Sequence, residues 1–328
     1  MKIFIIGSNS FMGSSLINYL FYKHKNKYQL FGCSRNNQAE KCYNLYREHK
    51  NKFNFFKIDL NKNSKKLIKI LKRVKPDYIF NFAAQSIVEY SWEHPEDWYK
   101  TNLISNIKLL EYLKKAKYLK KYIHSSTPEV YGSTKKKIKE NFNYFPSTPY
   151  ASSKASIDML LKNYFDNYKL PVVFTRVSNI YGAGQKIYKI IPKTIISILN
   201  SKKIPLHGGG LSKRSFIFSD DVSDAMIKIM KKSENGEIYH ITNEKMYTIK
   251  AVVKLVARIM NKKFQNCVII GKERPGKDLV YDLSSKKMRK LNWKSCISLE
   301  DGILQTKKWV ELNYKNLKKK ELKYNHQK

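Results

Sequence analysis

The stretch Gly7-Ser8-Asn9-Ser10-Phe11-Met12-Gly13 follows the apolar run Ile3-Phe4-Ile5-Ile6 and opens a segment with apolar residues at helical spacing. A strand, a tight turn of small residues and a helix form the unit that places a pyrophosphate at a helix N-terminus. Gly7 allows the sharp turn, Ser10 lets the backbone approach the phosphates, and Gly13 lets helix and strand pack closely. The stretch therefore predicts a dinucleotide site. The alternative is an ordinary turn without a ligand.

Composition favours a protein with a substantial core. The chain has 328 residues, of which 42% are hydrophobic, and this indicates two lobes. The cysteines are few and lack the spacing of metal ligands, so no metal site is expected and a reducing compartment suits them. They are Cys33, Cys42, Cys267 and Cys296. No apolar stretch approaches the roughly 20 residues that span a bilayer. We expect a cytoplasmic protein without a signal peptide or a membrane partner.

The charge is strongly positive, at +38, because 64 lysines and arginines stand against 26 acidic residues. The lysines are scattered and accompany many Asn, Ile and Tyr, which points to a compositional bias. No nucleic-acid-binding motif accompanies them, so we expect no dedicated nucleic-acid partner. A basic surface also steers phosphorylated substrates. Residues 316–328 are expected to form a solvated basic tail.

Strand-like and helix-like segments alternate through the first 180 residues. Strands are expected at residues 2–6, 29–33, 53–58, 78–82, 121–124 and 172–177. Longer helical patterns cover residues 97–116 and 148–168, and Ser64 is expected to cap another helix. This alternation predicts an α/β fold with a parallel, doubly wound sheet.

The pattern changes after residue 177. Helical stretches at 190–199, 220–230 and 249–260 surround a short strand at 238–241. We interpret this part as a smaller, mostly helical lobe that binds substrate. The expected dinucleotide domain is 1–180 plus about 216–244, and the expected substrate lobe is 181–215 and 245–315.

Tyr150-Ala151-Ser152-Ser153-Lys154 stands at the start of a helical pattern, with Ser147 or Thr148 as a cap. A tyrosine and a lysine four residues apart share one helix face, about 6 Å apart along the axis. A phenol ionises near pH ~10, and a nearby ammonium and an oxidised nicotinamide favour the phenolate. Tyr150 can then accept a hydroxyl proton while a hydride leaves the same carbon, and Lys154 can hold the nicotinamide ribose. The alternative is a surface tyrosine on a lysine-rich helix.

Two further strand ends carry polar residues. In Ser125-Ser126-Thr127-Pro128-Glu129-Val130-Tyr131-Gly132 the Thr127 hydroxyl can hold the reacting oxygen, and the turn at Pro128 can expose Glu129. The alternative for Glu129 is a solvated turn residue. In Asn81-Phe82-Ala83-Ala84-Gln85-Ser86 the small side chains permit close contact with a cofactor.

The end of the second strand bears on the choice of cofactor. An acidic residue usually stands there and binds the 2′-hydroxyl of NAD. This chain has Ser34 and Arg35 instead, which can hold a 2′-phosphate. We therefore favour NADP over NAD.

Together these motifs resemble the extended short-chain dehydrogenase/reductase family, in its nucleotide-sugar epimerase and dehydratase branch, over roughly residues 1–312. Further marks of the resemblance are Asp59-Leu60, Asn179-Ile180-Tyr181-Gly182, Arg214-Ser215-Phe216 with Asp221-Val222, and Glu273-Arg274-Pro275-Gly276. The resemblance implies a Rossmann-type domain, tightly held NAD(P) and a nucleoside-diphosphate sugar as substrate. It also makes a homodimer plausible, with residues 97–116 and 148–168 in the contact.

The resemblance also implies roles for single residues. Asp59 contacts the adenine, and Asn102 lies near the nicotinamide. The other implied cofactor contacts are Phe11, Met12, Leu60, Ala83, Ala84, Gln85 and Ser125. The implied substrate contacts are Ser86, Thr127, Asn179, Arg214 and Arg274. The two arginines suit a diphosphate because a guanidinium binds phosphate in bidentate fashion.

Glu129 resembles the base of the 4,6-dehydratases, in which C4 is oxidised, water leaves across C5 and C6, and the hydride returns to C6. Pro128 is a departure, because dehydratases of the thymidine-diphosphoglucose type usually carry an acidic Asp there. GDP-mannose dehydratases also lack that Asp, so Pro128 does not exclude dehydration. The acid for the C6 elimination is left unassigned, with Glu129 as the first candidate, and the nucleotide base stays open. The alternatives are a 4-epimerase or C4 reductase with the same Tyr150 and Lys154, and a non-catalytic dinucleotide-binding protein whose basic surface binds RNA or a partner.

Overall fold

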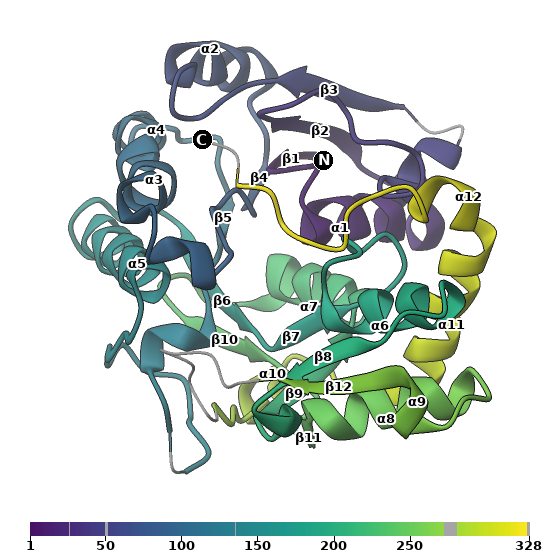
Figure 1. Cartoon of the computed structure of the whole chain (residues 1–328). Coiled ribbons are helices and arrows are strands. Elements are labelled where there is room, and N and C mark those ends of the chain that lie inside the picture. Colours follow the sequence, from purple (N-terminus) through teal and green to yellow (C-terminus); the bar gives the residue numbers. More distant parts are fainter. Residues whose placement is uncertain (26, 50–51, 135, 272–280, 327–328) are drawn as a thin grey trace.

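A seven-stranded sheet forms the centre of the molecule (Figure 1). The computed structural model describes residues 1–25, 27–49, 52–134, 136–271 and 281–326. In spatial order the strands are β10 (Ile238–Ile241), β6 (Val172–Val177), β5 (Lys121–Ser125), β4 (Tyr78–Asn81), β1 (Lys2–Ile6), β2 (Gln29–Ser34) and β3 (Phe53–Lys57). All neighbouring pairs in it run parallel. The predicted α/β, Rossmann-type doubly wound sheet is therefore confirmed.

Both faces of this sheet are covered by helices. In β1, Ile3 and Ile5 belong to a core with the helices on one face, whereas Phe4 and Ile6 belong to the core on the opposite face. The helices of the first face are α1 (Phe11–Lys23), α7 (Ser219–Lys232) and α10 (Lys286–Lys290). Those of the second face are α2 (Ser64–Val74), α3 (Pro95–Tyr99), α4 (Ser105–Leu113) and α5 (Pro149–Tyr168). Because alternate side chains of a strand point to opposite faces, continuously apolar strands are expected here.

The smaller part contains more strand than its sequence suggests. β9 (Lys213–Phe218) lies between β7 (Asn179–Tyr181) and β11 (Met246–Thr248), and β8 (Ile204–His207) pairs with β12 (Val268–Gly271). The helices here are α6 (Ile190–Leu199), α8 (Ile249–Ile259), α9 (Phe264–Cys267), α11 (Leu299–Leu312) and α12 (Tyr314–Leu317). Strands of three to six residues give too short an alternation to be recognised beside strongly periodic helices.

One helix prediction is confirmed with an internal irregularity, and another needs correction. The pattern at 97–116 is helical through α3, a π-helical turn at Lys100–Ile104 and α4, which follow one another without a break and end at residue 113. Ser64 is the first residue of α2 rather than its cap, because Asn63 precedes it at the cap position. The cap of α5 is as expected: the Thr148 hydroxyl accepts a hydrogen bond from the Ala151 amide at 3.1 Å.

The C-terminal residues differ from the solvated tail expected of them. Figure 1 shows the yellow trace leaving α12 and crossing the face of the molecule. Lys318, Lys319 and Lys323 are exposed, but Tyr324 and His326 are half-buried against other parts of the chain. Aromatic contacts, which a count of lysines does not reveal, hold this segment in place.

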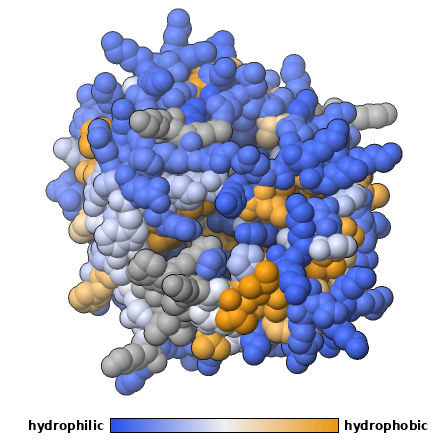
Figure 2. Space-filling view, viewed as in Figure 1, coloured by the Kyte–Doolittle hydropathy of each residue, from blue (hydrophilic) through white to orange (hydrophobic). Residues whose placement is uncertain are grey.

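Hydrophilic residues cover most of the face drawn in Figure 2, as the scattered lysines lead one to expect. Within the described ranges, no helix has both the length and the apolar character needed to cross a membrane. The four cysteines all lie at described positions and are free, and Cys33 and Cys267 are buried as predicted.

Candidate functional site

The turn between β1 and α1 has the conformation that its sequence predicts. Gly7 has φ +83°, and a Cβ atom on it would lie 2.6 Å from the Ala83 amide nitrogen. A Cβ on Gly13 would lie 2.4 Å from the Gly7 carbonyl oxygen. Ser10 caps α1, because its hydroxyl accepts a hydrogen bond from the Gly13 amide at 3.1 Å. Both glycines are therefore required by close backbone approach, and the helix presents its N-terminus beside the turn.

A cleft opens at the carboxyl ends of β1, β2 and β4, where ligands of doubly wound sheets bind. Nine of the predicted cofactor residues line it: Gly7, Ser10, Ser34, Arg35, Asp59, Leu60, Ala83, Ala84 and Gln85. Phe11, Met12 and Gly13 follow in the first turn of α1, and the Ser125 hydroxyl approaches the Met12 sulfur at 3.9 Å.

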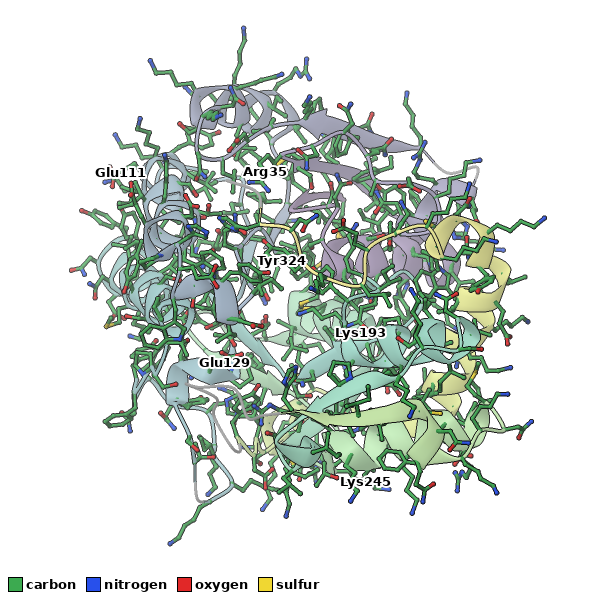
Figure 3. All side chains as sticks on the ribbon, viewed as in Figure 1. Arg35, Glu111, Glu129, Lys193, Lys245 and Tyr324 are labelled. Atoms are coloured by element: carbon green, nitrogen blue, oxygen red, sulfur yellow. The ribbon has the colours of Figure 1, made fainter. Side chains whose placement is uncertain are left out.

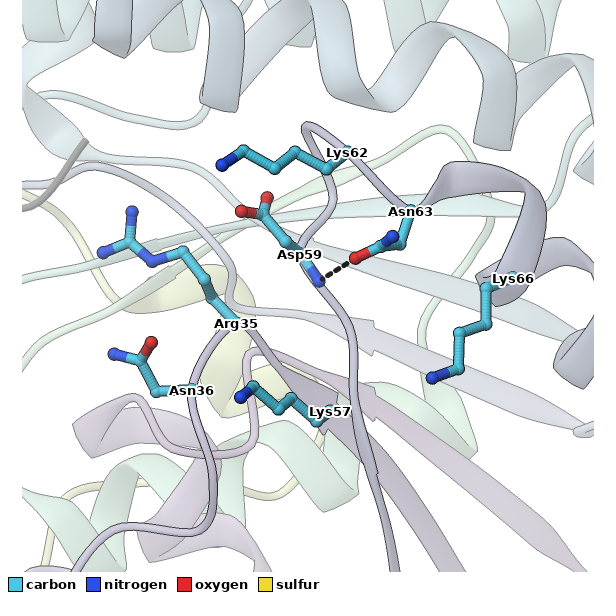
Figure 4. A pocket seen from close by; sticks show the side chains of 7 residues that line it. All are labelled: Arg35, Asn36, Lys57, Asp59, Lys62, Asn63 and Lys66. Atoms are coloured by element: carbon cyan, nitrogen blue, oxygen red, sulfur yellow. Dashed lines mark hydrogen bonds between the residues drawn. The ribbon is translucent and has the colours of Figure 1, made fainter.

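The β2 end of this cleft is basic. Arg35, Lys57, Lys62 and Lys66 surround a second, adjoining hollow in which Asp59 is the acidic residue (Figure 4). The Asp59 carboxylate accepts a hydrogen bond from the Asn61 amide at 2.9 Å, which fixes the turn after β3. The Ser34 hydroxyl accepts from the Asn9 amide at 2.8 Å. Ser34 is thereby tied to the glycine turn, and the cations gather beside it.

Asn102 is buried, and its amide clamps two parts of the site together. It accepts from the Gln85 amide at 2.9 Å, and it donates to the Gln85 carbonyl at 3.0 Å and to the Ser153 hydroxyl at 2.9 Å. The loop after β4 is thus fixed to α5. Placement of Asn102 near the nicotinamide stays a prediction, whereas its positioning of Gln85 is visible.

The predicted catalytic residues converge. Pro128 begins a 3-10 turn at Pro128–Tyr131, and the Thr127 hydroxyl caps that turn by accepting from the Glu129 amide at 3.3 Å. The Thr127 side chain also forms a hydrogen bond with the Tyr150 phenol, and the Glu129 carboxylate lies close enough to shift the Tyr150 pKa. Pro128 is buried and begins the turn that carries Glu129.

The pKa of the Tyr150 phenol is raised above its ordinary value. Burial is the main cause, and the Glu129 carboxylate adds to it, while the hydrogen bond with Thr127 lowers the pKa. The expected lowering by an ammonium is therefore not what the chain's own residues produce. The protein alone holds Tyr150 as a neutral phenol.

Lys154 is directed at the end of β5. Its ammonium donates to the Ser125 carbonyl oxygen at 2.7 Å and to His124 Nε2 at 3.3 Å. Burial lowers its pKa to about 8, and the Asp158 carboxylate opposes this shift. At neutral pH most of the Lys154 side chains are therefore protonated.

A buried ionic cluster lies beneath Lys154. Asp158 is fully buried and accepts from the Ser126 hydroxyl at 2.6 Å and from Arg176 Nη2 at 3.1 Å. The pKa of His124 lies well below its usual range, because its ring is buried and the positive charges of Lys154 and Arg176 oppose its protonation. The neutral ring can therefore accept the hydrogen bond from the Lys154 ammonium. These contacts attach α5 to β5 and β6 and fix where Tyr150 and Lys154 stand.

Arg214 and Asn179 lie on the smaller sheet. Arg214 is on β9 and Asn179 begins the neighbouring strand β7, opposite Phe216 in register. The Arg214 guanidinium stands 4.7 Å from the centre of the Tyr281 ring. Ser86 is exposed after β4. Arg274 falls outside the described residues.

Two residues that sequence reasoning did not single out also belong to the site. The buried Tyr281 raises the pKa of Tyr150 through its charge and contacts Arg214, so it connects the catalytic phenol with the predicted diphosphate site. Burial lowers the pKa of Lys189, and the charge of Glu129 raises it against that effect, so the ammonium and the carboxylate interact electrostatically. Lys189 directly precedes α6 at its cap position. Its place just before the predicted helix at 190–199 is the sequence feature that could have drawn attention to it.

Comparison with known proteins identifies the family. The family model for GDP-mannose 4,6-dehydratase matches residues 4–306. The chain belongs to this dehydratase family. The dTDP-D-glucose 4,6-dehydratase of Homo sapiens is 32% identical to it over 323 residues, covering 97% of this chain and 92% of that protein.

Solved structures of the same fold include dehydratases and epimerases. A dTDP-glucose 4,6-dehydratase from Bacillus anthracis, in complex with NAD, has a TM-score of 0.86 and 30% identity and covers 96% of this chain and 98% of that one. A UDP-glucose 4-epimerase from Thermotoga maritima, with UDP-glucose, has a TM-score of 0.86 and 26% identity, with 96% and 100% covered. The predicted resemblance is confirmed, and the protein is an enzyme of the nucleotide-sugar dehydratase family with epimerases as near relatives.

A nicotinamide dinucleotide fits the residues of this dehydratase-family site. Gly7 and Gly13 leave the backbone cradle that any Cβ would fill, and the N-terminus of α1 faces it. Ser34 and Arg35 stand where a ribose would end, and Tyr150 and Lys154 lie on the α5 side.

Proposed function

We propose that this protein is a nucleoside-diphosphate-hexose 4,6-dehydratase, with dTDP-glucose as the first substrate to test and GDP-mannose as the second. The observation that carries the proposal is the convergence of Thr127, Glu129 and Tyr150 beside Lys154. A carboxylate next to the catalytic phenol is what elimination across C5 and C6 requires. The relatives named above support dTDP-glucose.

The chain's residues divide the proton transfers among them. A bound dinucleotide would supply hydride acceptance at C4 and hydride return at C6. Thr127 would hold the sugar O4. Tyr150, which the chain's own residues keep as a neutral phenol, would take the O4 proton as a phenolate, a form that the positive charge of an oxidised nicotinamide favours. The C4 ketone acidifies the C5 hydrogen, which Glu129 removes as a proton. Glu129 then protonates the departing C6 hydroxyl, so water leaves and a C5=C6 double bond forms. When the hydride is returned to C6, C5 takes up the proton that Tyr150 received from O4, and Tyr150 regains its starting state.

Glu129 serves as both base and acid because Pro128 has no proton to donate. The positive charge of Lys189 favours the carboxylate form of Glu129 once its proton has gone to the leaving group. Arg214, with Tyr281 against its guanidinium, and Asn179 hold the nucleotide diphosphate, and Arg274 is assigned to the same task. In this proposal residues 181–215 and 245–315 form the substrate lobe.

The experiment compares products by mass. The purified protein is incubated with dTDP-glucose, GDP-mannose and UDP-glucose, and the sugar nucleotides are separated and weighed by mass spectrometry. Dehydration gives a 4-keto-6-deoxy product that has lost one water. A 4-epimerase, which the Thermotoga maritima structure keeps as the second candidate, gives a product of unchanged mass. Turnover without water loss on every sugar would overturn the dehydratase assignment.

We also propose NADP as the cofactor. A group of positive charges lies at the end of β2, where the 2′-position of the adenosine ribose falls in this fold. The group consists of Arg35, Lys57, Lys62 and Lys66. Ser34 replaces the usual acidic residue. The cofactor released on denaturation decides the matter, and NAD alone would refute the assignment.

A homodimer and a cytoplasmic location complete the proposal. Ile104, Ile107, Met159 and Tyr168 are large apolar side chains left exposed on the helical segments of residues 100–113 and 149–168. Pairing of these helices with those of a second copy would cover them. Size-exclusion chromatography of the wild type and of an Ile104→Asp/Met159→Asp variant tests this, since the variant should elute as a monomer.

A further inference from the structure

The C-terminal residues 318–326, which we call the C-terminal strap, are anchored beside β2 at one end. The Lys320 ammonium pairs with the carboxylate of Glu40, which follows β2. The same ammonium stands 5.6 Å from the centre of the Tyr43 ring. The strap therefore begins on the β2 side of the dinucleotide cleft.

The other end of the strap is anchored beside β4. His326 Nε2 contacts the Asp97 carboxylate at 2.8 Å, and its ring stacks on the Trp98 ring with centroids 5.2 Å apart. The Tyr90 hydroxyl donates to the Tyr324 carbonyl oxygen at 3.2 Å. Both Tyr90 and Asp97 come from the segment that follows β4.

Between its anchors the strap touches the cleft itself. The Tyr324 hydroxyl donates to Gln85 Oε1 at 3.4 Å, and Gln85 lines the cleft. The positive charge of Arg35, which follows β2, lowers the pKa of Tyr324 against the effect of burial, so the two side chains interact electrostatically. The Tyr324 ring also lies 5.5 Å from that of Tyr188, just before α6 in the smaller part.

The path between the anchors follows from the strand order. β1, which leads into the glycine turn, lies between β2 and β4, so the two anchors of the strap follow strands on either side of that turn. Lys320 and His326 are six positions apart in the sequence, and a stretch of this length reaches at most about 20 Å when extended. Two strand spacings amount to about 10 Å, so the strap is long enough to span them. Figures 1 and 3 show the trace, with Tyr324 labelled, crossing the middle of the molecule.

We propose that the C-terminal strap is part of the cofactor site: it closes the cleft over a bound nicotinamide dinucleotide and retains it, with Tyr324 as its contact residue. The strap lies beyond residues 4–306, which the family model matches, so family membership does not assign this role. The proposal rests on dinucleotide binding. The proposed dehydration explains why retention of the dinucleotide would be useful. A reaction that restores its cofactor in every cycle has no need to release it.

The test measures cofactor release. Wild type and a Tyr324→Ala/His326→Ala variant are loaded with NADP⁺ or NAD⁺, passed through a desalting column, and sampled over time for nucleotide that remains bound. The matched control is Lys319→Ala/Lys323→Ala, which changes two exposed side chains of the same segment. We expect the aromatic variant to lose cofactor at least tenfold faster than wild type and the control to stay within twofold. Equal release rates in all three proteins would overturn the proposal.

A second measurement uses the wild type alone, so it does not depend on how the variants fold. Hydrogen exchange of amides in residues 84–90 and 320–326 should slow together when NADP⁺ or NAD⁺ is added. Unchanged exchange in 320–326 on loading would overturn the role of the strap. No sugar is present in either experiment, so failure of the dehydratase assignment would leave both results intact and would appear only in the product assay.

Discussion

The Lys154 ammonium donates a hydrogen bond to the main-chain carbonyl oxygen of Ser125 at 2.7 Å. This bond joins α5 to the end of β5, after which Thr127 and Glu129 follow in the chain. Tyr150 stands one turn before Lys154 on the same helix, so the contact also sets the position of the phenol. Lys154 therefore fixes the position of α5 and also places a positive charge in the site.

Replacement of the phenol separates catalysis from folding. We predict that Tyr150→Phe lowers the rate of dehydration by about 10²- to 10⁴-fold, because the variant lacks the phenol oxygen that takes the O4 proton in the proposed reaction. Tyr168→Phe, on the same helix but exposed, should retain activity. Product formation followed by mass spectrometry checks both variants, and a Tyr150→Phe protein with wild-type turnover would contradict the role of Tyr150.

Glu129→Gln keeps the shape of the side chain and removes its basicity. In heavy water the wild type should place deuterium on the sugar. The C5 hydrogen is lost as a proton, and the new bond from hydrogen to C5 is formed with hydrogen that has exchanged with the solvent. The variant should form product about 10²- to 10⁴-fold more slowly. Glu300→Gln, exposed on α11, is the control. Full dehydratase activity in Glu129→Gln would show that another group removes the proton.

Local sequence patterns predicted much of the fold. The strands β1, β6 and β10 and the helix α6 have the predicted bounds. Continuous apolar runs and strong helical periodicity are local signals, and buried parallel strands between helices produce them clearly. The convergence of Thr127, Glu129 and Tyr150 was also predictable, because the carboxyl ends of parallel strands meet at one edge of a sheet.

Features that depend on distant partners were not predictable. The π-helical turn that interrupts the segment before α4 places Asn102 against Gln85, and no local pattern announces that contact. Tyr281 and Lys189 reach the site from the smaller part. The sequence of the C-terminal strap indicates only a lysine-rich end. Its half-buried residues form hydrogen bonds with residues that are more than 200 positions away in the sequence.

The buried lysines make stability depend on pH. Burial lowers the pKa of Lys154 to about 8, below the ordinary value of about 10.4 in the unfolded chain. Between these values the unfolded state binds more protons, so the free energy of unfolding should rise with pH in that window. For Lys154 the rise is on the order of 3 kcal/mol. Urea unfolding at a series of pH values from about 7 to 10 measures it.

Lys121 provides a matched control for Lys154. Burial lowers its pKa to about 8 as well, but its ammonium binds the Ser233 carbonyl oxygen at 2.7 Å, away from the site. Lys154→Met and Lys121→Met should each flatten the rise of stability with pH. Only Lys154→Met should abolish dehydration. A Lys154→Met protein whose stability still follows the wild-type pH curve would disprove the assigned titration.

The charge at the end of β2 gives a prediction about cofactor choice. Arg35→Gln removes the guanidinium that faces the predicted 2′-phosphate, and a hydrogen bond to a charged group contributes about 1.5–3 kcal/mol. The variant should therefore bind NADP⁺ about 10- to 100-fold more weakly and NAD⁺ with little change. Arg73→Gln, exposed at the end of α2, controls for the loss of one positive charge. Calorimetric titration of cofactor-free protein with each dinucleotide measures the two affinities. Equal losses for NADP⁺ and NAD⁺ would mean that Arg35 contacts a part common to both, such as the pyrophosphate, and that the 2′-phosphate assignment is wrong.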